Sequence, residues 1–153
     1  MTQPLVAISV VTYRRPHSLR RLMNSLNKLQ FQHTVPPRIR FCVVDNDADR
    51  SAKAALDDHP FPSDWQIRYE VVSQRGLSHV RNRAIELSED ADFLVFIDDD
   101  QVADACWLDE LLATQQKFDA DVVWGRNLPL FDQPPSEHVH RLGYFQKNGI
   151  GGG

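Results

Sequence analysis

Short apolar runs rich in β-branched residues alternate along this chain with segments of helical periodicity. The first run, residues 5–13, is almost continuously apolar, which is typical of a strand buried on both faces. Pro16 then suits the first turn of a helix, and leucines follow it at helical spacing. Because strand and helix alternate four times, the pattern predicts an α/β fold with a mostly parallel sheet and helices on both faces.

Further strands and helices are expected along the rest of the chain. The strand expected at residues 92–97 contains an unbroken apolar run, 93–97, which predicts a central position, and Asp104 suits the N-cap of the helix that follows it. Earlier helices are predicted around residues 51–56 and after Gly76. The helix after Asp104 should turn inward Trp107, Leu108, Leu111, Leu112 and Phe118. The strands after the first are expected at residues 38–45, 66–72, 92–97 and 120–125.

Composition fits one soluble globular domain and excludes several classes of protein. The 153 residues are 42% hydrophobic and 25% charged, which is enough to build one core. The net charge of -4 argues against a nucleic-acid partner, because domains that bind nucleic acids are usually basic. Cys42 and Cys106 lack metal-binding spacing and indicate a reducing compartment. No apolar segment reaches bilayer-spanning length, so a cytoplasmic protein is expected.

Polar clusters follow the predicted strands at the points where those strands end. In a parallel sheet the carboxyl ends share one edge, and ligands bind beyond that edge. Clusters that are far apart in the sequence should therefore gather along one rim. They are residues 12–15 (TYRR), 45–47 (DND), 74–82 (QRGLSHVRN) and 98–100 (DDD).

Three adjacent carboxylates, Asp98, Asp99 and Asp100, follow the apolar run at 93–97. Because Asp is common in turns, a hydrated, exposed turn is the simplest interpretation of such a triplet on an arbitrary loop. At the end of a central strand, however, unneutralised charge is disfavoured, and carboxylate oxygens suit Mg2+ or Mn2+. If the backbone stays extended, Asp98 and Asp100 point to one side and share a cation, with Asp99 opposite.

The segment 74–82 adds positive charge to the same rim. Arg75, Arg81 and the start of a helix can contact anionic oxygens, although a glycine such as Gly76 also caps helices in many proteins. The sequence has no GxGxxG and no Walker A motif, which argues against a dinucleotide dehydrogenase and a P-loop enzyme. The acids and arginines together predict a phosphate-containing ligand bound with a divalent cation.

Four motifs in this order resemble the nucleotide-sugar-binding half of a family 2 glycosyltransferase with the Rossmann-like GT-A fold. They are ISVVTYRRP, VVDND, RGLSHVRNRAIE and FLVFIDDD, and the likeness covers residues 5–127. The resemblance implies residues 1–127 as the nucleotide-sugar-binding part. It implies residues 128–153 as the loop-like, truncated start of an acceptor-side region, which leaves the GT-A fold incomplete at the C-terminus.

The resemblance also implies roles for individual residues. The nucleobase would lie against Thr12, Tyr13 and Arg14, with Asp45 as a further base contact. The ribose would contact Asp98, and the metal would bind Asp100 with Asp98. The donor sugar would lie near Trp124 and Gly125. The residues implied to bind the substrate are Thr12, Tyr13, Arg14, Asp45, Gly76, Arg81, Asn82, Asp98 and Asp99.

The expected activity is metal-dependent transfer of a sugar from a nucleoside-diphosphate sugar to an acceptor hydroxyl, with inversion, in the synthesis of a cell-surface polysaccharide or glycoconjugate. The resemblance implies Mg2+ or Mn2+, a glycan or lipid-linked acceptor, and peripheral association with the inner face of the membrane. It assigns no catalytic base, because only Asp132 and Glu137 are acidic in the final segment.

Two alternatives stay open. A non-catalytic nucleotide-binding module, or an inactive fragment, would account for the missing base. A sugar-nucleotide pyrophosphorylase is disfavoured because its glycine-rich first loop is missing after residues 5–13. The alternating His138 and His140 lack a third ligand and are interpreted as surface residues.

Overall fold

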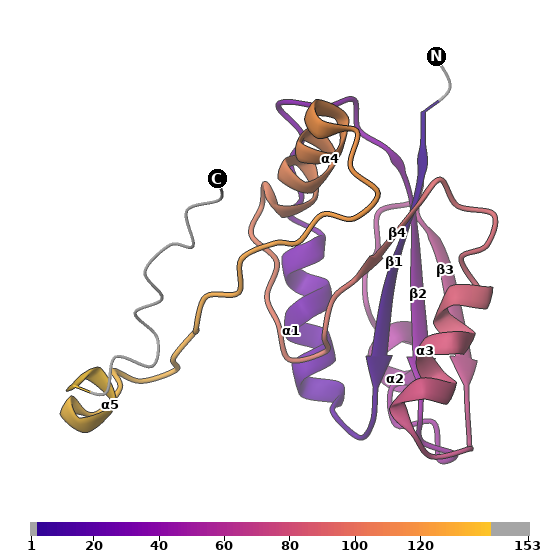
Figure 1. Ribbon diagram of the computed structural model, residues 1–153. Coiled ribbons are helices and arrows are strands. Elements are labelled where there is room, and N and C mark those ends of the chain that lie inside the picture. The colour runs from indigo at the N-terminus through magenta and orange to yellow at the C-terminus, as the bar shows by residue number, and fades with distance from the viewer. Residues whose placement is uncertain (1–2, 142–153) are drawn as a thin grey trace.

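The computed structural model describes residues 3–141, except for the side chains of residues 139 and 140. Strands and helices alternate along it as the sequence pattern predicts (Figure 1). The elements are β1 (Leu5–Thr12), α1 (Pro16–Leu26), β2 (Arg38–Asp45), α2 (Lys53–Asp57), β3 (Gln66–Val71), α3 (Leu77–Glu86), β4 (Phe93–Phe96), α4 (Trp107–Phe118) and α5 (Glu137–Arg141).

The four strands form one parallel sheet in the order β3-β2-β1-β4. β1 and β2 pair along their whole length, from Leu5 opposite Arg38 to Thr12 opposite Asp45. β4 pairs with the first half of β1 and ends at Phe96, opposite Ser9. The strands therefore point toward one end of the molecule, where the predicted rim lies (Figure 1).

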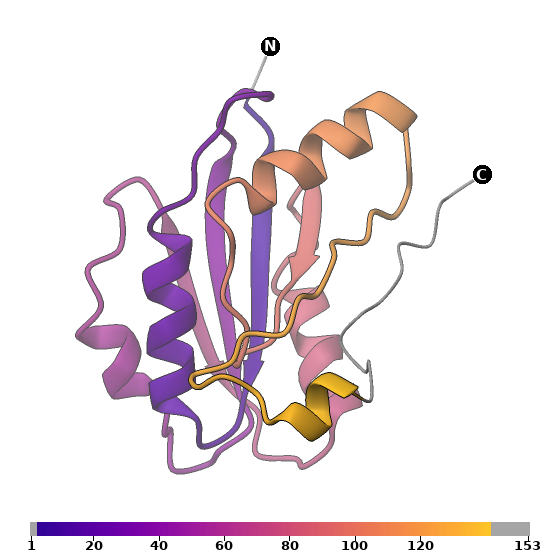
Figure 2. The same cartoon turned by 90° about the vertical axis from the view of Figure 1, so that its left-hand side faces the viewer.

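Helices cover both faces of the sheet, which confirms the predicted fold class. On one face, α1, α2 and α4 pack over the larger core, which contains Ile8, Leu22, Phe41 and Leu108. On the other face, α3 packs through Val80 and Ala84 against Cys42 and Val44 of β2. Figure 2 shows α1 and α4 on the near face, with the chain after α4 running down the same side. No helix within residues 3–141 is long and apolar enough to cross a bilayer.

The prediction that the fourth strand is central is wrong for the described part of the chain. β4 forms hydrogen bonds with β1 alone, and its side chains are only partly buried, with Phe96 43% exposed. An unbroken apolar run indicates that both faces of a strand are covered. It does not tell how many neighbours pair with the strand's edges, which depends on the rest of the sheet.

The fifth strand predicted at residues 120–125 is also absent. The segment pairs with none of the described strands, and Val122 and Trp124 are 81% and 87% exposed. β-propensity describes side chains that fit a paired, half-buried surface, and this segment has no paired neighbour among the described residues.

α4 differs from its prediction in two details. Asp104 lies before the N-cap, which is Cys106, and its Oδ1 accepts a hydrogen bond from the Cys106 backbone N–H at 2.9 Å. Leu108 and Leu112 are buried as expected, whereas Phe118 in the last turn is 67% exposed. Helical spacing alone therefore overestimates the buried stripe of this helix.

A buried carboxylate fixes the long connection between α1 and β2. Asp109 of α4 accepts backbone hydrogen bonds from Gln32, His33 and Thr34 at 2.8–2.9 Å, and a fourth from the Thr34 hydroxyl. Burial alone would raise the pKa of Asp109, but these donors outweigh it and lower the pKa to about 2. The carboxylate thus provides hydrogen-bond acceptors for backbone N–H groups of a loop that pairs with no strand.

Replacing Asp109 by Asn should destabilise the fold by roughly 2–4 kcal/mol, because the amide leaves buried N–H groups without an acceptor. Since the pKa is lowered from its ordinary 3.8, the carboxylate stabilises the native chain above about pH 4. That contribution should disappear as the pH falls toward 2. Urea unfolding across this pH range measures both effects.

The matched control is Glu110→Gln, which removes an exposed charge from the next position of α4. It should leave the unfolding free energy nearly unchanged. Equal losses for the two variants would contradict the role given to Asp109.

Candidate functional site

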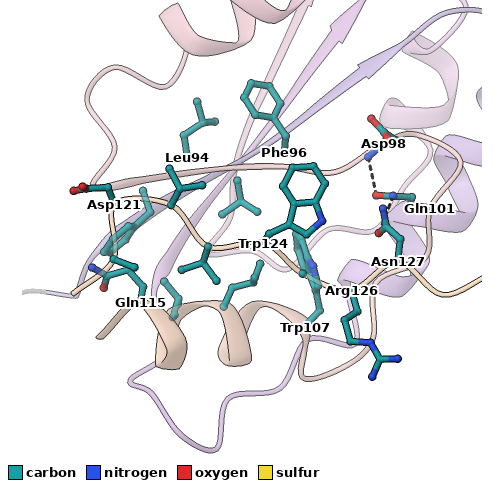
Figure 3. A pocket seen from close by; sticks show the side chains of 18 of the residues that line it. Leu94, Phe96, Asp98, Gln101, Trp107, Gln115, Asp121, Trp124, Arg126 and Asn127 are labelled. Atoms are coloured by element: carbon teal, nitrogen blue, oxygen red, sulfur yellow. Dashed lines mark hydrogen bonds between the residues drawn. The ribbon is translucent and has the colours of Figure 1, made fainter. Parts of the chain in front are cut away.

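The acid turn, residues 98–100, follows β4 at the carboxyl edge of the sheet. Asp98 and Asp100 are exposed, whereas Asp99 is 5% exposed, but residues 99 and 100 form a turn and not the extended backbone on which the predicted alternation rests. Gln101 closes the turn, because its backbone N–H donates to the Asp98 carbonyl and its side-chain oxygen accepts from the Asp98 N–H, each at 3.1 Å. Figure 3 shows Gln101 also reaching Asn127, a contact of 3.2 Å.

Two of the three carboxylates have internal partners. Asp99 accepts a hydrogen bond of 2.7 Å from the Thr12 hydroxyl at the end of β1. One guanidinium nitrogen of Arg15 lies 3.2 Å from Asp99 and 3.3 Å from Asp100. Asp98 has no side-chain partner among residues 3–141, and its carboxylate is exposed. The turn therefore keeps one carboxylate for structure and presents two outward.

Arg14 and Arg15 point to different acids although they are adjacent. Arg14 has a positive φ of 54°, and its guanidinium pairs with Asp47 and Asp49, at 3.2 Å in each case. The hydrogen bond from Arg14 lowers the pKa of Asp47 below its ordinary value. The Arg14 guanidinium carbon also lies 5.2 Å from the centre of the Tyr13 ring, a cation–π contact that helps to position this ring at the rim.

Asp45 is a buried structural acid in the described chain. Its oxygens accept from the backbone N–H groups of Asp47 and Ala52 and from the Tyr69 hydroxyl, at 2.9–3.0 Å. Burial, followed by the bond to Asp45, raises the pKa of Tyr69 well above its ordinary range. Asp45 thus holds the loop after β2 in place, and its implied contact with a nucleobase stays a prediction.

Asn46 is the rim residue that the sequence reasoning missed. Its amide nitrogen donates to the carbonyls of Val72 and Gln74, at 2.6 and 2.9 Å, and thereby joins the ends of β2 and β3. No hydrogen bond within the described residues engages its oxygen, and the side chain lines the cavity at the rim. The signal was present as the middle residue of DND, but an acid-centred search passed over it.

The start of α3 depends on a glycine. Gly76 has φ 133°, which L side chains rarely adopt, and an added Cβ would lie 3.2 Å from the His79 ring. One turn later, Arg81 is exposed and has no hydrogen bond or ion pair within residues 3–141. Gly76 therefore sets the helix start, and Arg81 is a free cation at the rim.

A cavity of about 510 Å³ lies between the ends of β1, β2 and β4 and the first turns of α3. It brings together six of the ten residues predicted to bind substrate or metal: Thr12, Tyr13, Arg81, Asp98, Asp99 and Asp100. The other four, Arg14, Asp45, Gly76 and Asn82, lie outside its lining. Asn46 and Arg15 line it as well.

A second cavity, of about 540 Å³, adjoins the first between β4, α4 and the segment 120–127. The two cavities share Arg81, Phe96 and Asp98. Figure 3 shows Trp124 over this apolar space, with Trp107 and Leu94 nearby. Gly125 also lines it, so both residues implied to lie near the donor sugar share this cavity with Asp98 of the acid turn.

The acid turn fits a divalent cation shared with a ligand. Its donors are hard carboxylate oxygens, and Asp98 and Asp100 both face solvent beside the cavity. Among the described residues there is no group of three or more His, Cys, Asp or Glu side chains that encloses an ion. Two carboxylates with water and ligand phosphates are the coordination that Mg2+ commonly takes.

Comparison with known proteins places these features in one family. The profile described as "Glycosyl transferase family 2" matches residues 7–150. The succinoglycan biosynthesis protein ExoM of Rhizobium meliloti (strain 1021) is 34% identical over 120 residues, which make up 78% of this chain and 38% of ExoM. The chain thus spans well under half the length of that relative.

Solved structures share the fold at lower sequence identity. S. aureus TarS 1-349 in complex with UDP-GlcNAc matches with a TM-score of 0.64 at 22% identity, over 82% of this chain and 37% of TarS. Mannosyltransferase PcManGT from Pyrobaculum calidifontis, in complex with GDP-Man and Mn2+, gives 0.59 at 22% identity, over 79% and 34% of the two chains. At this identity the likeness establishes the shared fold.

The bond from Thr12 to Asp99 should be necessary for the acid turn. Thr12→Val keeps the side-chain shape but removes the donor, so the buried Asp99 loses a partner, at a cost of about 2 kcal/mol in unfolding free energy. Thr12→Ser keeps the hydroxyl and should cost below about 1 kcal/mol. Urea unfolding compares the three proteins, and a serine variant less stable than the valine variant would refute the assignment.

Proposed function

This chain belongs to glycosyl transferase family 2, and we propose that it binds a nucleoside-diphosphate sugar at the rim and takes part in transfer of the sugar to an acceptor hydroxyl. The observation that carries the proposal is the single cavity lined by Tyr13, Asn46, Arg81 and the acid turn. It combines an aromatic face, a free amide oxygen, an unpaired cation and outward carboxylates. A nucleobase, a diphosphate and a divalent cation are complementary to this set.

Each group at the rim suits one part of the donor. The Tyr13 ring offers a face for the base, and the Asn46 oxygen accepts a hydrogen bond from a base or ribose donor. Arg81 is placed for the diphosphate oxygens. Asp98, between the two cavities, is placed for the ribose and the cation. Arg14 and Asp45 act behind this surface by fixing Tyr13 and the loop that carries Asn46.

Mg2+ or Mn2+ would be held by Asp98 and Asp100, together with the donor's phosphates. When bound, such an ion stabilises the negative charge of the leaving nucleoside diphosphate. The relative with a bound nucleotide sugar and Mn2+ supports this assignment. Hydrogen bonds within the chain fix the shape of the acid turn. Thr12 holds Asp99 inward, and Gln101 closes the backbone around Asp98.

The acceptor side is proposed more coarsely. The apolar cavity lined by Trp124 and Gly125 adjoins the acid turn and, as the resemblance implies, would hold the donor sugar, so an acceptor hydroxyl would approach the sugar there. An acceptor hydroxyl must lose a proton to a carboxylate base, for which we assign no residue. The relative named for succinoglycan biosynthesis supports a glycan or lipid-linked acceptor in cell-surface polysaccharide synthesis. Two parts of the proposal rest on the family resemblance: inversion of configuration at the anomeric carbon, and glycan assembly at the cytoplasmic face of the membrane.

Calorimetry with UDP, GDP and dTDP, each with and without Mn2+, tests the donor site. At least one nucleotide should bind, and Mn2+ should tighten its binding. Asp100→Ala should weaken Mn2+-dependent binding by about tenfold or more, which corresponds to about 1.4 kcal/mol. Asp64→Ala, an exposed acid outside both cavities, is the matched control and should bind like the native chain.

Binding that is identical in the Asp100→Ala variant and in the native chain would refute the metal assignment. Release of UDP from UDP-GlcNAc, or of GDP from GDP-mannose, separates the remaining alternatives. Tight nucleotide binding with no turnover of either donor would favour a non-catalytic binding module.

A further inference from the structure

Arg15 has an unusual place at the acid turn. A single nitrogen of its guanidinium is shared by Asp99 at 3.2 Å and Asp100 at 3.3 Å, and its side chain lines the rim cavity. The neighbouring arginines have different partners. Arg14 is held by Asp47 and Asp49, and Arg21 reaches the acid turn through the Asp100 backbone carbonyl.

The contact between Arg15 and Asp100 is easily broken. Both side chains are more than half exposed, at 56% and 57%, and exposed ion pairs contribute little to stability because water screens them. Asp99, in contrast, is buried and has a second partner, the Thr12 hydroxyl, which donates to it at 2.7 Å. Loss of Arg15 from Asp100 therefore leaves the turn anchored.

Only the side chain of Arg15 is free to move. Its carbonyl accepts a hydrogen bond of 3.0 Å from the Leu19 N–H, and Pro16 follows it as the first residue of α1. The backbone is thus fixed at the helix start. The long Arg15 side chain can rotate about its torsions and still place its guanidinium in the cavity that it lines.

We propose that Arg15 is an exchangeable counter-ion that makes the divalent cation and the nucleoside diphosphate bind cooperatively, an inference that rests on the proposed function. Without ligand, Arg15 neutralises Asp100. A divalent cation bound to Asp100 repels the guanidinium, which leaves and pairs with the incoming diphosphate. The cation alone must displace Arg15 without compensation, whereas with the diphosphate present the displaced guanidinium gains a new partner.

The proposal predicts effects of opposite sign in one variant. Arg15→Gln removes the competitor of the cation, so Mn2+ alone should bind about threefold tighter. The same variant loses a partner of the diphosphate, so UDP in the presence of Mn2+ should bind about fivefold weaker. Without the cation Arg15 stays paired with Asp100, so UDP alone should bind both proteins alike, and the factor by which Mn2+ tightens UDP binding should fall by the same factor of about five.

The experiment titrates Mn2+ alone, by the electron paramagnetic resonance signal of the free ion, and UDP with and without Mn2+, by calorimetry. Proteins compared are the native chain, Arg15→Gln, Arg15→Lys and Arg20→Gln. Arg20 pairs with Asp58 and lies outside the rim cavity, so its variant controls for the loss of one positive charge. Arg15→Lys keeps the charge and should bind Mn2+ alone like the native chain.

A merely structural role for Arg15 predicts that Arg15→Gln weakens Mn2+ and UDP alike, and that result would overturn the proposal. An Arg15→Gln variant that binds Mn2+ alone with the same affinity as the native chain would also overturn it. Should Arg15→Gln fail to fold, shown by its far-UV circular dichroism, Arg15→Lys decides by the same measurements, because it alters diphosphate pairing without removing the charge. If UDP does not bind the native chain even with Mn2+, the proposed function fails, while the Mn2+ titration still tests whether Arg15 competes for Asp100.

Discussion

The candidate site depends on the parallel pairing of β1 with β2 on one side and β4 on the other. This pairing fixes how far each strand extends toward the rim. β1 and β2 end together at Thr12 and Asp45, whereas β4 ends opposite Ser9, so the chain after it turns back beside Thr12. The Thr12 hydroxyl then reaches Asp99. A shift of one residue in this pairing would turn Thr12 to the other face and leave Asp99 buried without that partner.

The aspartates of this chain fall into a structural group and a group available to a ligand, and burial distinguishes the two. Asp45, Asp99 and Asp109 are buried, and each accepts a hydrogen bond from a side-chain hydroxyl. Such acids hold loops and turns in place. Asp98 and Asp100 are exposed on either side of a buried acid, and they are the ones available to a ligand. In both DND and DDD, a structural acid thus stands beside a residue that faces the cavity.

The sequence was sufficient for the parts of the structure that local patterns determine. Apolar periodicity located β1 to β4, and the rule that parallel strands end on one edge placed Thr12, Arg81 and the acid turn around one cavity. It failed where a residue's surroundings depend on distant pairing. The edge position of β4 and the unpaired segment 120–125 depend on which strands lie nearby, and this information is not local. Asn46 and Arg15 were overlooked because their importance comes from single atoms: a free amide oxygen and a shared guanidinium nitrogen.

The two cavities are mechanically connected through the acid turn. Arg81, Phe96 and Asp98 line both, and Gln101 bonds to Asp98 on one side and Asn127 on the other. A change in the position of segment 120–127 therefore reaches the backbone of Asp98 through one side chain. If a ligand in one cavity changes the affinity of the other cavity for its ligand, the reverse effect is equal in free energy, because linkage is reciprocal. Three residues that line both cavities, together with the Gln101 side chain, are the described groups through which such an effect would pass.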